Sequence, residues 1–123
     1  MAHQLTGIHH IQLAMPPGEE DAGRRFYGDL LGLSEIPKPS ELAPRGGIWF
    51  RSGQLEVHLG VERQDFRPAT KAHPAFLVSG LDELRARLEE AGYRIDEDVQ
   101  FEGYRRFHVR DPFGNRLELV QPA

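Results

Sequence analysis

Residues 8–32, IHHIQLAMPPGEEDAGRRFYGDLLG, contain two different hydrophobic periods in one stretch of chain. The segment 8–15 alternates apolar and polar side chains, which predicts a β-strand with two different faces. The segment 19–32 places apolar side chains four positions apart, which predicts an amphipathic helix that ends at a glycine. The apolar positions are Ala22, Phe26 and Leu30, and the glycine is Gly32. This strand-to-helix unit decides the fold, because a second one follows it.

The second unit begins near residue 73. Its predicted strand is the apolar run 74–78, and its predicted helix has leucines at 81, 84 and 88 and ends at Gly92. Each unit precedes a predicted β-hairpin with a glycine-containing turn. The hairpins span 48–60 and 107–120, while 34–44 is predicted as a loop or an irregular strand and 62–71 as a linker.

Two pairs of residues mark an internal repeat. His73 follows His10 by 63 residues, and Glu118 follows Glu56 by 62 residues. Near-equal offsets at similar places in both units predict two βαβββ modules, about 2–62 and 71–123, related by a pseudo-twofold axis. We therefore expect an α+β domain spanning 1–123, in which the modules form a cup-shaped, partly closed mixed β-sheet with the helices outside.

Composition limits the possible partners. The 123 residues carry 15 basic and 19 acidic side chains, a formal net charge of −4, and no cysteine. The acidic balance argues against a nucleic-acid partner, and the missing cysteines exclude disulfides and thiolate metal sites. Apolar runs fall far short of the roughly 20 residues that cross a bilayer. We expect a cytoplasmic protein that binds a small molecule and no membrane.

The repeated residues are metal-ligand types on the face of each sheet that lies away from its helix. Side chains alternate along a strand, so His10 shares a face with Gln12, as Glu118 does with Arg116. If the two faces line one cavity, two imidazoles and two carboxylates meet there. The predicted ligands of one divalent ion per site are His10, Glu56, His73 and Glu118. Zinc, nickel, cobalt, manganese and iron(II) suit this set, which leaves positions open for a substrate.

The roles of several other polar residues remain open. His58 and His108 share the cavity face and could each be a spare ligand, a proton shuttle or a substrate contact. We expect substrate contacts, together with Gln12 and Arg116, although His58 could replace Glu56 as the fourth ligand. The basic group Arg105, Arg106 and Arg110 could bind a substrate anion or form a solvated edge. A polar cavity that binds only an organic ligand is the alternative to a metal site.

Five motifs in order resemble the glyoxalase/bleomycin-resistance/dioxygenase superfamily, also called vicinal oxygen chelate. They are GIHHIQLAM, RFYGDLLGL, LEVHLG, HPAFLV and DPFGNRLEL, and together they span nearly the whole chain. The resemblance implies paired βαβββ modules around a divalent metal. The family's ligand positions fall on His10, Glu56, His73 and Glu118. Members of this size are usually homodimers. In many of them the modules pair across subunits, and in that arrangement His10 and Glu56 would come from one chain and the other two ligands from its partner; pairing within one chain is the alternative.

The resemblance covers several activities. A glutamate at the position of Glu56 is similar to the glyoxalase I pattern, in which a ligand carboxylate, here Glu56 or Glu118, also carries a proton. Extradiol dioxygenases use two histidines and one carboxylate, which His10, His73 and Glu118 would supply. Acyl-CoA epimerases also belong to this superfamily, whereas the loop of fosfomycin transferases that binds potassium and phosphonate has no counterpart. We expect a metal-dependent lyase, isomerase or dioxygenase, the alternative being a metal-free, bleomycin-resistance-like drug binder.

Overall fold

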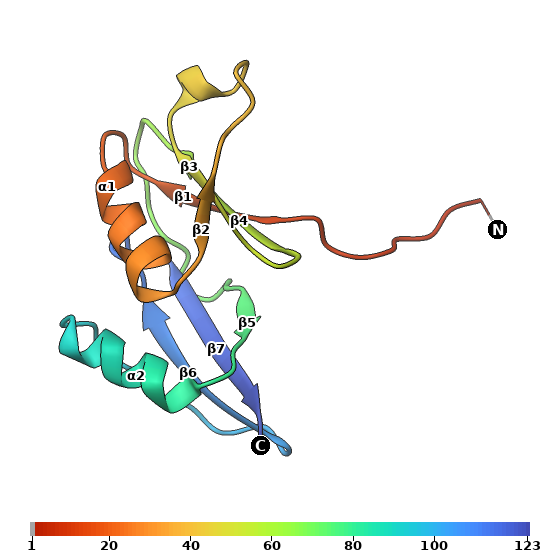
Figure 1. Ribbon diagram of the computed structural model, residues 1–123, viewed down its shortest axis with the longest axis vertical. Coiled ribbons are helices and arrows are strands. Elements are labelled where there is room, and N and C mark those ends of the chain that lie inside the picture. Colours follow the sequence, from red (N-terminus) through yellow and green to blue (C-terminus); the bar gives the residue numbers. More distant parts are fainter. Residues whose placement is uncertain (1) are drawn as a thin grey trace.

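The computed structural model describes residues 2–123, so Met1 of the predicted domain lies outside the described residues. Two β-sheets with helices packed beside them confirm the predicted α+β fold (Figure 1). The four-stranded sheet has the order β1-β4-β3-β2, and the three-stranded sheet has the order β5-β7-β6. Each sheet comes from one of the predicted modules. No closed barrel forms among the described residues.

In the first half of the chain, the elements follow the predicted order. They are β1 (Ile11–Met15), α1 (Glu20–Gly23), the π-helix η1 (Arg24–Leu30), β2 (Ser34–Ile36), the 3-10 helix η2 (Ala43–Arg45), β3 (Ile48–Ser52) and β4 (Leu55–Val61). β1 runs parallel to β4, and β3 pairs antiparallel with both β4 and β2. The strand predicted from residue 8 starts only at Ile11, which pairs with Val57. Residues 2–10 form an extended arm that leaves the body of the molecule (Figure 1).

The predicted amphipathic helix has an unusual second part. The amide of Leu31 donates to the carbonyl of Phe26 at 2.9 Å, a bond across five residues that defines a π-helical turn. This wider turn brings two consecutive aromatic side chains, Phe26 and Tyr27, into the core with no exposed surface. The helix ends at Gly32, whose φ of 82° is the left-handed conformation that favours glycine at this position.

The second half repeats this order with one difference. Its elements are β5 (Ala75–Leu77), α2 (Leu81–Glu90), β6 (Tyr104–Arg110) and β7 (Arg116–Pro122). The strand expected between α2 and β6 is reduced to a single β-bridge, in which Asp96 and His108 exchange two backbone bonds of 2.9 and 2.8 Å. Beyond the bridge, Gln100 accepts from the amide of Arg106 through its side chain, so a side-chain bond stands where a strand would place a backbone bond.

A buried polar network joins the two halves. The Tyr27 hydroxyl donates to Asp111 Oδ2 at 2.7 Å, and Asn115 Nδ2 donates to the carbonyl of Ala14 at 2.7 Å. Asp111 Oδ1 also accepts from the amides of Phe113 and Asn115. The turn between β6 and β7 is therefore tied to both β1 and η1. Helices long and apolar enough to span a membrane do not occur between residues 2 and 123.

Candidate metal centre

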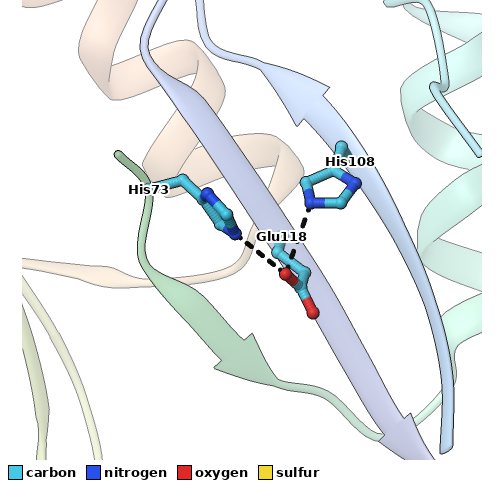
Figure 2. Close-up of side chains that lie close together, drawn as sticks. All are labelled: His73, His108 and Glu118. Atoms are coloured by element: carbon cyan, nitrogen blue, oxygen red, sulfur yellow. Dashed lines mark hydrogen bonds and ion pairs between the residues drawn. The ribbon is translucent and has the colours of Figure 1, made fainter. Parts of the chain in front are cut away.

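Three elements of the second half bring His73, His108 and Glu118 together (Figure 2). His108 on β6 pairs directly with Glu118 on β7, because the two strands fold back on each other around the turn at 111–115. Residues directly opposite each other in an antiparallel pair project from the same face. His73 reaches the same carboxylate from the segment that enters β5.

The distances within this cluster are those of groups that share one ion or proton. His73 Nε2 lies 2.9 Å and His108 Nε2 lies 3.3 Å from Glu118 Oε1. One ligand atom from each residue can be chosen so that all three lie within 4.8 Å of one another. Metal–nitrogen and metal–oxygen bonds are about 2.0–2.2 Å, so a single cation can contact donors at this spacing.

The tautomer of His73 is set by its backbone contact. Its Nδ1 lies 2.8 Å from the carbonyl of Lys71, to which only a protonated Nδ1 can donate. In the neutral imidazole, Nε2 then presents a lone pair toward Glu118. Two acceptors 2.9 Å apart repel each other unless a proton or a cation lies between them. This second contact through the remote nitrogen is typical of histidines that ligate metals.

Two polar atoms of the cluster have no hydrogen-bond partner among residues 2–123, namely His108 Nε2 and Glu118 Oε2. Both side chains are buried, with 2% and 3% of their residue surface exposed. Unpaired buried polar atoms are costly and rare in native proteins. Burial, followed by the charge of Arg116, lowers the pKa of His108, so this imidazole is neutral near pH 7 and offers a lone pair. The donor set therefore fits a divalent cation.

Arg106 lies at the same cluster, although the sequence fits a solvated edge equally well. Its Nη1 lies 3.3 Å from Glu118 Oε1, and its side chain is only 11% exposed. The other members of the basic group lie elsewhere: Arg105 pairs with Asp82, and Arg110 donates to the carbonyl of Gly114. Alternation along β6 places Arg106 on the face of His108, a signal that was present in the sequence.

The predicted ligands of the first half form a separate cluster. The rings of Trp49, His58 and His10 are stacked in that order, with centroids 3.8 and 4.1 Å apart. His58 Nε2 lies 2.9 Å from Glu56 Oε1, and Arg51 donates to Glu56 Oε2 at 3.3 Å. The bond with His58 is the main cause that lowers the pKa of Glu56, while burial lowers the pKa of His58. Within residues 2–123, no hydrogen bond or ion pair joins this cluster to the cluster around Glu118.

A cavity of about 530 Å³ lies beside the second cluster, between β1 and the segment 62–74. His73, Gln12 and Arg116 all line it, so two of the four expected substrate contacts border a cavity next to the cluster. The Gln12 side chain covers Gly60, where an added Cβ would lie 2.7 Å from its Nε2. The other two expected contacts lie in the clusters themselves: His58 under the His10 ring, and His108 beside Glu118.

Comparison with known proteins identifies the family. The family model described as "Glyoxalase/Bleomycin resistance protein/Dioxygenase superfamily" matches residues 7–119. The solved structure of a glyoxalase family protein from Bacillus anthracis is 46% identical to the chain, with 100% of both chains covered and a TM-score of 0.93. None of the curated proteins matches the chain.

Two more distant structures share the fold alone. A glyoxalase/dioxygenase from Nostoc punctiforme is 24% identical, with 95% of this chain and 91% of that chain covered and a TM-score of 0.77. A fosfomycin resistance protein from Listeria monocytogenes is 19% identical, with 98% and 94% covered and a TM-score of 0.74.

Proposed function

The chain belongs to the glyoxalase/bleomycin resistance protein/dioxygenase superfamily, and on that basis we propose that it is a metal-dependent enzyme acting on a small oxygenated substrate. The reaction would be of the lyase, isomerase or dioxygenase kind. The observation that carries this proposal is the cluster of the half-buried His73 with the buried His108 and Glu118, in which two ligand atoms have no partner among residues 2–123. The 46% identity to a glyoxalase family protein supports the same class.

We propose that His73 and His108 bind the ion through Nε2 and Glu118 through a carboxylate oxygen. Imidazole and carboxylate donors suit zinc, nickel, cobalt, manganese and iron(II). Such an ion, when bound, would act as a Lewis acid that stabilises negative charge on adjacent substrate oxygens.

The residues of the chain would carry the proton and hold the geometry. Glu118 is the candidate base because its Oε2 has no hydrogen-bond partner among residues 2–123 while Arg106 contacts Oε1, so one oxygen can be fixed while the other accepts a proton. The Nδ1 bond to the Lys71 carbonyl would keep the His73 ring aimed at the site. Gln12 and Arg116 would bind the substrate in the adjoining cavity.

We propose further that His10 and Glu56 reach this centre from a second copy of the chain, which makes the protein a homodimer with shared sites. Within residues 2–123 no hydrogen bond or ion pair joins them to the Glu118 cluster, which supports this arrangement, as does the exposure of His10. Glu56 would have to exchange its contacts with His58 and Arg51 for the ion, so His58 remains the alternative to Glu56 as a ligand.

Elemental analysis of untagged protein tests the centre directly. We expect about one divalent ion per chain, in the range typical of a single site per protomer. His108→Asn should lower this content sharply, whereas His3→Asn, a substitution in the exposed arm, should leave it unchanged. Protein that takes up no ion even after reconstitution would contradict the enzyme proposal and favour the metal-free drug binder.

Mixing two defective chains tests the shared site. One chain carries His10→Ala and Glu56→Gln, and the other carries His73→Ala and Glu118→Gln. If sites form across the dimer, a 1:1 mixture should recover about a quarter of the wild-type sites, because half of the dimers are mixed and each has one intact site. Recovery of no sites, with dimers present, would place all ligands in one chain.

A further inference from the structure

We propose that the 530 Å³ cavity beside His73 binds an oxyanion group of the substrate, held by Arg67 and Arg116. This inference rests on the proposed function and specifies the class of substrate: a small molecule with a carboxylate, phosphate or phosphonate on an otherwise largely apolar body. Arg67 lies in the segment 62–71, whose polar residues and Pro68 predict a linker.

The cavity is assembled from three parts of the chain that are distant in sequence. β1 supplies one wall, the segment 62–74 supplies another, and the junction of the β6–β7 turn with β7 supplies Asn115 and Arg116. Its volume is in the range of small-molecule sites, about 300–1,000 Å³. His73 belongs both to this wall and to the candidate metal centre, so a molecule in the cavity lies next to the ion that we propose.

The charged side chains of the cavity favour an anion. Arg67 and Arg116 form no ion pair with a carboxylate in the part of the chain described, whereas Arg24 and Arg105, for example, do. Among residues 2–123, the Arg116 side chain donates to the Lys71 carbonyl at 3.3 Å and approaches His73 Nδ1 at 3.4 Å. Glu62 is the single carboxylate of the lining and is exposed. Guanidinium groups bind oxyanions through paired, charge-assisted hydrogen bonds.

The backbone that follows Arg67 is anchored at three residues, so its position is part of the fold. Pro68 packs on the β6–β7 turn so closely that a Cβ on Gly114 would lie 2.9 Å from its ring. The carbonyl of Lys71 accepts from His73 Nδ1, and the carbonyl of Ala69 lies 3.4 Å from Arg110 Nη1. Such anchoring lowers the entropy cost of ordering the cation when an anion binds.

The remaining lining determines what accompanies the anion. Much of it is apolar, with Ile11, Leu13 and Phe66 among the lining residues. Asn115 is already bonded to Ala14 and Asp111, which leaves Gln12 as the amide available to a ligand. The site thus offers cations for an oxyanion head, apolar contacts for a body and one amide for a further polar group.

The test uses inorganic phosphate and benzoate as separate probes, titrated into the full-length protein and followed by backbone NMR shifts of Phe66, Ala69 and Ala72. Arg67→Gln should weaken binding of the preferred probe about tenfold, the loss of one charge-assisted bond pair. Arg63→Gln is the matched control: Arg63 is an exposed arginine of the same segment, bonded to the Arg45 carbonyl and outside the cavity lining. Preference for phosphate or for benzoate distinguishes a phosphoryl from a carboxylate substrate, and either preference supports the proposal.

The oxyanion-site proposal is wrong if the Arg67→Gln and Arg63→Gln variants bind the probe with equal affinity. It is also wrong if the NMR shifts caused by the probe do not include the amides of Phe66, Ala69 and Ala72. Metal content, measured on the same samples, separates this failure from a failure of the proposed function. Metal-loaded protein without anion binding would reject the oxyanion site alone. Anion binding by protein that holds no metal would reject the metal centre and leave this site standing.

Discussion

In the first half of the molecule His58 is enclosed between the rings of Trp49 and His10 and bonded to Glu56, whereas in the second half Glu118 keeps a buried oxygen without a partner among residues 2–123. The same residue types thus occupy repeated positions with different bonding. In the first cluster, both oxygens of Glu56 already have donors. Whether a repeated residue is free to bind an ion therefore depends more on the hydrogen-bond partners that the fold supplies than on the type of residue.

Strand register contributes to this difference. Ile11 pairs with Val57, so the parallel ladder, if continued by one residue, would place His10 beside Glu56. In the second sheet Ala75 pairs with Glu118, and His73 lies two residues earlier. The two histidines therefore approach their carboxylates from different positions along the ladder, although sequence spacing makes them look equivalent.

The largest effect is expected where the halves are joined. Asp111→Ala removes an acceptor used by the Tyr27 hydroxyl, by Asn115 Nδ2 and by two backbone amides, all inside the protein. Leaving such buried donors unpaired should lower the free energy of unfolding by about 3 kcal/mol or more, measured by urea denaturation. Glu90→Gln, at the exposed end of α2, should change it by less than about 0.5 kcal/mol. Similar values for both variants would show that the network does not couple the halves.

The contrast between the two carboxylates can be tested by metal binding. Glu118→Gln should weaken binding of the divalent ion at least about a hundredfold, roughly 2.7 kcal/mol, because it removes a buried ligand. Glu56→Gln should weaken it about tenfold or less, since Glu56 must leave His58 and Arg51 to bind. Competition titration against a chelator measures both. A larger loss for Glu56→Gln would reverse the order that we assign to the two clusters.

The Tyr27 hydroxyl provides a smaller, pH-dependent effect. Burial raises the pKa of Asp111, while the hydrogen bond from Tyr27 acts in the opposite direction. Because the folded protein holds this proton more tightly than the unfolded chain, the contribution of Asp111 to stability falls as pH rises from its ordinary pKa of 3.8 through the raised value.

Tyr27→Phe removes that bond and raises the pKa of Asp111 further. The stability lost through the substitution should therefore grow as pH rises across the same window, reaching about 1.5–2 kcal/mol at pH 7. Denaturation curves at pH 4 and pH 7 measure it. A loss that is equal at both pH values would mean that the hydroxyl does not interact with the ionised carboxylate.

The smallest effects concern the arginines that contact the two carboxylates. Arg51→Gln should change the free energy of unfolding by less than about 0.5 kcal/mol, because its ion pair with Glu56 is half exposed. Arg106→Gln should cost about 1 kcal/mol, since Arg106 is mostly buried, bonds to the Val99 carbonyl and lies over the Phe101 ring. Thermal unfolding of the two metal-free variants measures both effects. Equal decreases in their unfolding temperatures would show that the two arginines contribute equally to stability.

Hydrophobic period and turn residues were enough to predict most of the fold. The strands and helices follow from the alternation at 11–15 and from the spacing of leucines in α2, and the motif order predicted the family. The π-helix was not predictable, because the spacing of Ala22, Phe26 and Leu30 also fits an ordinary α-helix. The residues inside this turn pack against distant parts of the chain: the Phe26 ring lies beside the ring of Tyr93 in the other half.

The candidate site was predictable in part. The repeat selected His73 and Glu118, whose side chains lie 2.9 Å apart in the structure. The grouping of His108 with Glu118 follows from hairpin register, since Arg110 and Arg116 face each other across the turn and the pairs continue outward. Counting residue pairs outward from that turn therefore predicts that His108 lies opposite Glu118. Trp49 and His58 are likewise direct partners across the β3–β4 hairpin, but the third ring of the stack, His10, precedes β1 and hairpin register gives no signal for it.

The π-helical turn at Arg24–Leu30 also bears on how the chain tolerates changes in length. Neighbouring residues of an α-helix point about 100° apart, but here one additional residue per turn lets Phe26 fill the core while Tyr27 reaches Asp111. A homologue shorter by one residue at this turn could keep every strand of the first sheet and still lose the hydroxyl contact to the second. Insertions and deletions here would therefore alter the coupling between the halves before they alter either half.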